Sequence, residues 1–280
     1  MRIISSELIE NTVYELFLQA NKTLPSDVET CMRAYADAES NSRARSIMGK
    51  LIDNLGAARD MDIPICQDTG MAVVFVWIGN QVVVSGDLLS DAVNKGVRRA
   101  YTDGYFRKSV VADPIARVNT EDNTPAVIHT HIVKGDGVRI VCCPKGFGSE
   151  NMSAIRMFNP SATREDIIDF VVQAVRNAGS NPCPPIVIGV GIGGTFEYCA
   201  YMSKLALTRK INENNSDEYY AQLEKDILEK VNNTGVGPQG FGGDTTAIGV
   251  RVEHFATHIA GLPVAVNISC HVTRHTERIL

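Results

Sequence analysis

The order of apolar segments along the chain is the feature that most constrains its fold. Over the first 60 residues, apolar side chains such as Val13 and Leu16 recur at helical spacing. The strand-like segments "MAVVFVWIG" and "QVVVSG" then follow one another closely, and later strands also come in neighbouring pairs. Because such strands can pair directly and do not alternate strictly with helices, we predict an α+β fold. It would have N-terminal helices, followed by a mixed, largely antiparallel β-sheet flanked by helices.

Local signals place individual elements. The strand-like "PAVIHTHIV" and "GVRIVCC" flank the short turn Lys134-Gly135-Asp136, which predicts a β-hairpin. Thr163, with Asp166 three residues later, predicts a capped helix over about 164–178. The remaining predicted helices cover 87–103, 195–210 and 217–233, and the remaining predicted strands are "PPIVIGVGI", "TTAIGVRVEHFA" and "PVAVNISC". Without an internal repeat or linker, we expect one domain over residues 1–280, helical over about 1–60.

Composition narrows the class of protein. The chain is 44% apolar and 21% charged, which is typical of a soluble globular enzyme. A net charge of −5 without a basic cluster argues against nucleic acid or an anionic membrane as a general partner. The N-terminus lacks the apolar region of a signal peptide, and no apolar run approaches the ~18 residues of a membrane span. We therefore expect a cytoplasmic protein.

The segment "GVGIGG" satisfies the G-x-G-x-x-G pattern with Gly189, Gly191 and Gly194, after a strand and before a helix. A dinucleotide fold also needs a buried strand ending in an acid about 20 residues later. That position holds the polar "INENNSDEYY". The pattern therefore favours a tight strand-to-helix turn or an amide-lined anion site, and leaves a non-catalytic nucleotide-binding module as an alternative.

Three of the seven cysteines lie at the boundaries of predicted elements. Cys66 stands in "PICQDTG", Cys183 in "NPCPP", and Cys270 ends a strand in "NISCHVTRH". An odd number of cysteines without an export signal argues against a disulfide framework. Three thiolates match a [4Fe-4S] cluster that keeps one iron free of protein ligands. Inert apolar cysteines and a zinc site remain alternatives, because the wide spacing is not a local metal motif.

Other polar segments have both ordinary and functional interpretations. His129 and His131 alternate on one strand and are either exposed strand residues or a metal pair, of which we favour the first. Arg107 stands in an apparent loop and could bind a carboxylate. "PKGFGSEN" and "GPQGFGGDTT" are glycine-rich loops whose amides could bind an anion. The C-terminal residues from His271 onward form a basic segment, interpreted as a solvated end or a contact with a partner chain.

Five motifs in one order give the sequence a resemblance to a known family. "PICQDTG", "PKGFGSEN", "NPCPP" with "GVGIGGTFE", "GPQGFGGDTT" and "HIAGLPVAVNISC" together resemble the α subunit of the two-subunit class I fumarate hydratases. The L-tartrate dehydratase α subunit is the near relative. The resemblance covers nearly the whole chain.

This resemblance implies an iron–sulfur hydro-lyase with a [4Fe-4S] cluster held by three cysteines. The cysteines that match by motif are Cys66, Cys183 and Cys270. The residues that match substrate contacts are Gln67, Asp68, Arg107, Gly146 and His258, and Asp68 is the one expected to carry a proton.

The resemblance further implies reversible hydration of fumarate to L-malate, a reaction of the tricarboxylic acid cycle. The single-chain relatives continue into a second domain, so we expect a separate β subunit and an α2β2 heterotetramer. L-Tartrate dehydration is the alternative within the family, because the two substrates differ by one hydroxyl group.

Overall fold

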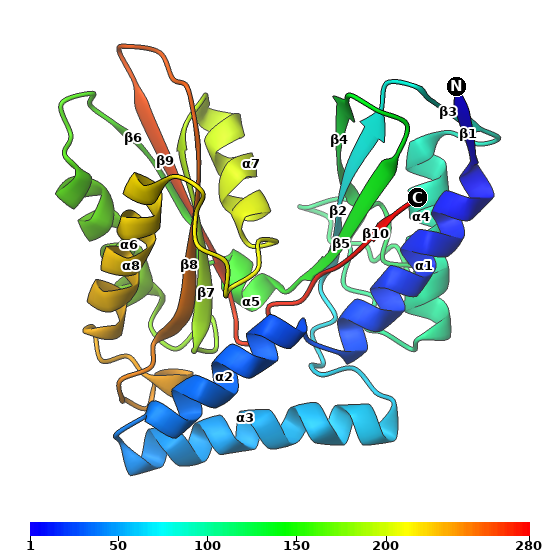
Figure 1. Ribbon diagram of the computed structural model, residues 1–280. Coiled ribbons are helices and arrows are strands. Elements are labelled where there is room, and N and C mark those ends of the chain that lie inside the picture. Colours follow the sequence, from blue (N-terminus) through cyan, green and yellow to red (C-terminus); the bar gives the residue numbers. More distant parts are fainter. The chain divides into compact units, whose positions relative to one another are not determined.

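The computed structural model describes residues 1–280, and the chain divides into two compact units (Figure 1). The first comprises residues 1–25, 55–147 and 274–280, and the second comprises residues 26–54 and 148–273. The prediction of a single domain over residues 1–280 stays a prediction.

The first unit has a four-stranded mixed sheet with two helices on one face (Figure 1). Its strands run in the order β10-β5-β2-β4, and α1 and α4 pack together against the sheet. The bounds are α1 Ser6–Lys22, β2 Met71–Gly79, α4 Leu89–Asp103, β4 Val127–Val133, β5 Val138–Lys145 and β10 Thr276–Ile279. A separate pair of parallel strands joins β1 Arg2–Ser5 to β3 Val82–Ser85.

Alternation along the central strands explains which face of this sheet is covered. Val74 and Val76 of β2, with Ile140 of β5, point toward α1 and α4 and are fully buried. Gly96 of α4 lies so close to α1 that an added Cβ would be 2.5 Å from the Glu10 carbonyl oxygen. Burial of this apolar face is the main stabilising contribution to the unit.

The second unit repeats the plan of a mixed sheet, now with helices on both faces (Figure 1). Its strands run in the order β6-β9-β7-β8, with α6 and α8 on one face and α7 on the other. The bounds are α2 Ser26–Ala38, β6 Ala154–Phe158, α6 Arg164–Ala178, β7 Ile186–Gly193, α7 Phe196–Ala206, α8 Glu218–Asn232, β8 Ala247–Phe255 and β9 Leu262–Ser269. Helix α3, Ser42–Met61, contributes residues to both units, and α5 is the single turn Phe147–Glu150.

The predicted fold class is confirmed. After the short strand β1, the helices α1, α2 and α3 precede both four-stranded sheets. Four of the seven strand pairs are antiparallel, namely β5 with β10, β2 with β5, β6 with β9, and β7 with β9. The helix predicted over about 164–178 is α6, and Thr163 and Asp166 form its capping box. No helix is long and apolar enough to span a lipid bilayer.

The predicted β-hairpin is wrong. Strands β4 and β5 are consecutive in sequence, but β2 lies between them, parallel to β4 and antiparallel to β5. The turn between β4 and β5 is instead bonded to the end of β2, where Gly79 N donates to Gly137 O at 2.8 Å and Gln81 N donates to Gly135 O at 2.9 Å. The fully buried Phe75 and Val76 gain more contact in the centre of the sheet than at its edge.

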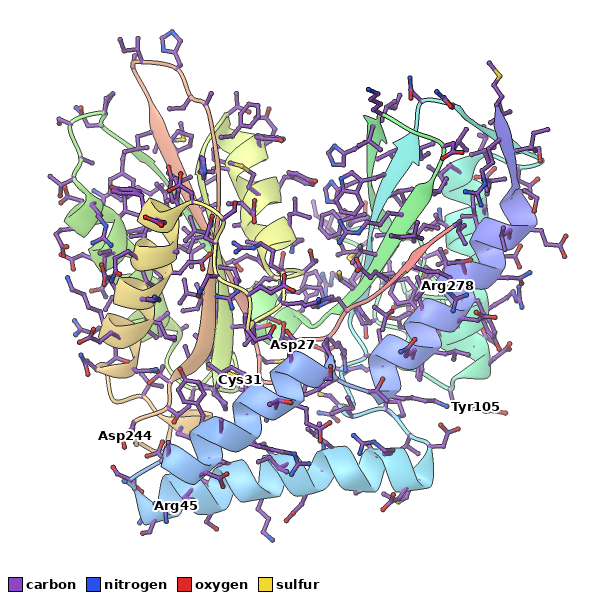
Figure 2. The ribbon with its side chains drawn as sticks, viewed as in Figure 1. Asp27, Cys31, Arg45, Tyr105, Asp244 and Arg278 are labelled. Carbon is purple, nitrogen blue, oxygen red and sulfur yellow. The ribbon has the colours of Figure 1, made fainter.

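The C-terminal segment is also not a solvated tail. Residues 276–279 form β10, which pairs antiparallel with β5. Arg278 extends from β10 (Figure 2) and makes an ion pair with Glu15 of α1. Thr276 Oγ1 donates to the Leu16 carbonyl at 2.9 Å. Pairing with the edge of β5 satisfies backbone groups that an isolated tail would leave to water.

Candidate active site

The turn "PICQDTG" is closed by its own aspartate. Asp68 Oδ1 accepts a hydrogen bond from the Gly70 N–H at 3.0 Å, which is an Asx turn. Gly70 has φ +76°, and an added Cβ would lie 2.7 Å from the Lys145 backbone nitrogen. Only glycine provides both the left-handed conformation and this close approach. The chain therefore turns at Gly70 and enters β2 at Met71. Cys66 and Asp68 are half-buried, and Gln67 is exposed.

The middle of the turn is held by a hydrogen bond from a buried tyrosine. Tyr101 is fully buried, and its hydroxyl donates to the carbonyl of Thr69 at 2.6 Å. Burial raises the pKa of Tyr101, so the hydroxyl keeps its proton and remains a donor. Thr69 Oγ1 donates to the Arg107 carbonyl at 3.0 Å, which fixes the loop carrying the exposed Arg107 guanidinium to the same turn. The segments that carry Asp68 and Arg107 are thus joined within the first unit.

A second cation lies beneath the turn. Arg274 is only 5% exposed, and its Nη2 donates to the Asp68 carbonyl. Its Nε and Nη1 atoms are buried without a hydrogen-bond partner. A buried guanidinium with unsatisfied donors costs stability. The one bond that it makes to this turn holds the Asp68 carbonyl.

The "PKGFGSEN" segment touches the same carboxylate. Phe147 N donates to Asp68 Oδ2 at 3.0 Å, and an added Cβ on Gly146 would lie 3.1 Å from Asp68 Oδ2. Of the glycines in this segment, Gly146 is therefore the one packed against Asp68. The carboxylate of Asp68 is fixed by one backbone N–H on each oxygen.

The Cys183 turn lies in the second unit. Cys183 is exposed and has φ 54°, a left-handed conformation that is uncommon for a residue with a Cβ. Its carbonyl lies 3.0 Å from Nδ1 of His271, and this ring nitrogen must carry the proton because a carbonyl only accepts. His271 directly follows the half-buried Cys270, so the segments bearing Cys183 and Cys270 are joined by hydrogen bonds.

His258 lies elsewhere in the second unit, in the exposed connection between β8 and β9. Its Nδ1 accepts a hydrogen bond from Ala260 N at 3.1 Å, which assigns the ring proton to Nε2. The ring is therefore oriented by its own loop and presents an N–H donor.

Six of the seven thiols fall into two groups by their surroundings; the seventh, Cys143 on β5, is half-buried, and none of the seven is in a disulfide. Burial raises the pKa of Cys31, on α2 (Figure 2), to about 11 and that of Cys199 to about 11. Burial also raises the pKa of Cys142 well above its usual value. Because a metal ligand must be a thiolate, these three are poor ligands. The accessible Cys66, Cys183 and Cys270 have the donor chemistry that an iron–sulfur cluster requires.

The G-x-G-x-x-G glycines have a packing role. Gly189 and Gly191 lie inside β7, where an added Cβ would be 2.0 Å from the Ser203 carbonyl and 2.1 Å from the Cys199 carbonyl. They let α7 lie directly on the strand. A dinucleotide-binding loop needs its first glycines after the strand, so the structure does not support that alternative.

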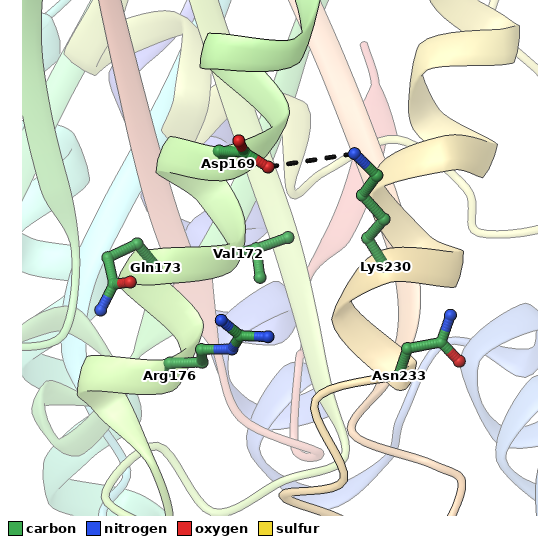
Figure 3. Close-up of a pocket in the computed structure, with 6 residues that line it drawn as sticks. All are labelled: Asp169, Val172, Gln173, Arg176, Lys230 and Asn233. Carbon is green, nitrogen blue, oxygen red and sulfur yellow. Dashed lines mark ion pairs between the residues drawn. The ribbon is translucent and has the colours of Figure 1, made fainter.

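A surface depression between α6 and α8 offers no comparable chemistry (Figure 3). Its Lys230 is within 2.5 Å of Glu165 and 3.9 Å of Asp169. The positive charge of Lys230 is therefore already compensated. His129 and His131 are half-buried on β4, where they stack on Phe75 and Trp77.

Comparison with known proteins identifies the class of protein that this turn and these thiols belong to. The profile of the family described as fumarate hydratase (fumerase) matches residues 10–279. A protein of Methanocaldococcus jannaschii named "Putative L(+)-tartrate dehydratase subunit alpha" is 38% identical over 272 residues, which cover 95% of each chain. The L(+)-tartrate dehydratase subunit alpha of Escherichia coli K12 is 31% identical over 255 residues, covering 90% of this chain and 84% of the relative.

These matches define a hydro-lyase, in a family known for iron–sulfur hydro-lyases. The chain belongs to the class I fumarate hydratase family, as a member of its α-subunit type. The resemblance carried by the five sequence motifs is thereby confirmed.

The sequence pattern does not indicate the contacts of three residues. Arg274 and His271 lie in the basic C-terminal segment, and Gln239 lies in the glycine-rich loop "GPQGFGGDTT". The adjacency of His271 to Cys270 was the available signal. Nothing in the local pattern indicated that Arg274 is buried under Asp68.

Proposed function

We propose that this chain is the cluster-bearing α subunit of a hydro-lyase that reversibly hydrates fumarate to L-malate. The observation that carries the proposal is the turn at residues 66–70. Its backbone is held by Tyr101 and Arg274, while the side chains of Cys66, Gln67 and Asp68 stay accessible to different degrees. An ordinary turn would need Asp68 and Gly70 but neither the thiol nor the amide.

Cys66, Cys183 and Cys270 would hold a [4Fe-4S] cluster. The fit rests on the donor set, because these are accessible thiols at turns and none is in a disulfide. When bound, such a cluster supplies a Lewis acid through the iron that has no protein ligand. Gln67, next to Cys66, would donate its amide hydrogen bonds to the substrate.

Asp68 is the residue proposed to move a proton. Each of its oxygens accepts one backbone N–H and keeps a further lone pair, so the carboxylate can still accept a proton. In hydration, a water molecule would lose a proton to Asp68 as its oxygen bonds to one alkene carbon. The other alkene carbon gains a proton from a second group. In dehydration Asp68 returns its proton to the departing hydroxyl group.

Two further side chains would orient the dicarboxylate. Arg107 presents an exposed guanidinium, which can bind a carboxylate through two parallel hydrogen bonds. His258 would donate its Nε2 hydrogen to the substrate. Gly146 would keep the space beside Asp68 open, because any side chain there would crowd the carboxylate.

A separate β subunit would complete the enzyme. The relatives are named as α subunits, and names of this kind belong to enzymes with a second type of chain. We propose an α2β2 assembly in which the β subunit donates the second proton-transfer group and binds the other carboxylate.

L-Tartrate is the second candidate substrate, favoured by the names of the relatives. The two reactions differ by one substrate hydroxyl group, which a hydrogen-bonding site can discriminate strongly.

The test is to co-express the chain with its β subunit, purify the complex anaerobically, and assay both substrates. The proposal expects consumption of fumarate and formation of L-malate, with Cys183→Ser abolishing the iron–sulfur absorbance and Cys142→Ser preserving it. If the complex dehydrates L-tartrate but does not hydrate fumarate, L-tartrate is the substrate and the fumarate assignment is wrong. An intact chromophore in Cys183→Ser would refute the ligand assignment.

A further inference from the structure

The Cys183 turn, residues 181–185, is held at two of its carbonyl groups. Each carbonyl accepts two hydrogen bonds from one residue of another segment, an arrangement called a clamp below. The Pro184 carbonyl accepts from the backbone N of Gln239 at 2.8 Å and from its Nε2 at 2.6 Å. The preceding carbonyl, of Cys183, accepts from the backbone N of His271 at 3.4 Å and from its Nδ1 at 3.0 Å. Two consecutive carbonyls are thus each bonded to the main chain and the side chain of a single residue.

The clamps hold a conformation that the chain would not keep by itself. Cys183 and Gln239 both have φ 54°, and both carry a Cβ. Such residues retain left-handed backbone only where surrounding contacts over-determine it. The clamps supply those contacts to the residue whose thiol is exposed.

The clamps also connect two thiols. His271 follows Cys270, so its bonds to the Cys183 carbonyl fix the segment of one cysteine against that of the other. Gln239 Nε2 lies 3.4 Å from His271 Nδ1, which places the two clamps side by side. A cluster held by few ligands gains most when those ligands are positioned before it arrives.

We propose that Gln239 and His271 are positioning residues that set the Cys183 and Cys270 thiols for the iron–sulfur cluster. This inference rests on the proposed function. Neither side chain needs to touch the cluster, because each acts on the backbone that carries a ligand. Removal of groups that orient metal ligands typically weakens metal binding about 10- to 100-fold.

The test reconstitutes the full chain anaerobically with ferrous iron and sulfide and measures iron release to a chelator. We expect Gln239→Leu and His271→Phe to release iron at least about tenfold faster than the unaltered chain. Gln239→Gly suits the left-handed backbone and removes only the side-chain donor, so it separates positioning from folding. Circular dichroism melts verify that each variant is folded.

Two matched substitutions in the same unit serve as controls. Gln173→Leu removes an exposed amide that donates to Asn177, and His254→Phe keeps a ring stacked on Tyr220. Both should release iron at the rate of the unaltered chain. Equal release rates for folded Gln239→Gly, His271→Phe and the controls would overturn the inference alone. An unaltered chain that takes up no iron and sulfide would overturn the proposed function, and this inference with it.

Discussion

Replacing Asp68 by Asn separates the structural role of this residue from its proposed chemical role. The two carboxylate oxygens accept from Gly70 N and Phe147 N, each at 3.0 Å. Asparagine keeps one oxygen and replaces the other with an NH2 group. Whichever way the amide lies, one of the two N–H donors loses its acceptor.

The size of the structural effect follows from those two bonds. A hydrogen bond to a charged group contributes about 1.5–3 kcal/mol. Phe147 is 47% exposed, so water can replace the lost acceptor if the NH2 group faces that side. We therefore expect Asp68→Asn to lower the free energy of unfolding by about 1–2 kcal/mol, near the lower end of that range. Urea unfolding of the chain measures this change.

The chemical effect should be far larger. Because an amide cannot accept the proton, turnover of the complex with its β subunit should fall about 10²- to 10⁴-fold. The iron–sulfur absorbance should persist, since the cysteines are untouched. Asp62→Asn is the matched control, because its carboxylate is 80% exposed and makes only a surface ion pair with Lys22. Near-normal turnover of Asp68→Asn, with the chromophore retained, would remove this residue from the mechanism.

Three further substitutions test other parts of the structure. Arg274→Met removes the donor to the Asp68 carbonyl together with two unsatisfied buried donors. The free energy of unfolding should therefore change by less than about 2 kcal/mol while turnover falls. A loss above about 3 kcal/mol would show that the guanidinium is fully paired. Gly191→Ala would place a Cβ 2.1 Å from the Cys199 carbonyl, and calorimetric melting should show a loss of at least about 2 kcal/mol because the helix must move. In Asp122, burial raises the pKa, but bonds from Thr124 and Arg98 outweigh it and lower the pKa to about 2. The stability that it contributes is present above the unfolded pKa of about 3.9 and is lost as the pH falls toward about 2, so the difference between Asp122→Asn and the unaltered chain should shrink over that interval; a constant difference would contradict the assignment.

Local features of the fold were predictable from sequence. The capping box of Thr163 and Asp166 begins α6 as expected, and Ser5 caps α1 through the Leu8 N–H. The Asx turn of Asp68 and Gly70 likewise depends on residues only two positions apart. Interactions of this range form wherever the residues occur, so the sequence pattern is sufficient.

Strand pairing was not predictable in the same way. The turn between β4 and β5 has the length and composition of a hairpin, yet β2 takes the central position. A short turn is compatible with either arrangement. Which strand occupies the centre depends on the apolar contacts of every strand in the sheet, and the strand that is most apolar on both faces gains most there.

The candidate site shows the same division. The sequence by itself determined that Cys66, Gln67 and Asp68 share one turn, and the family to which the chain belongs. Only the tertiary structure decided that Arg274 is buried beneath Asp68, and that His271 and Gln239 bind the carbonyls of the Cys183 turn. These groups come from segments 55 to 206 residues apart, joined by hydrogen bonds whose partners no local pattern specifies.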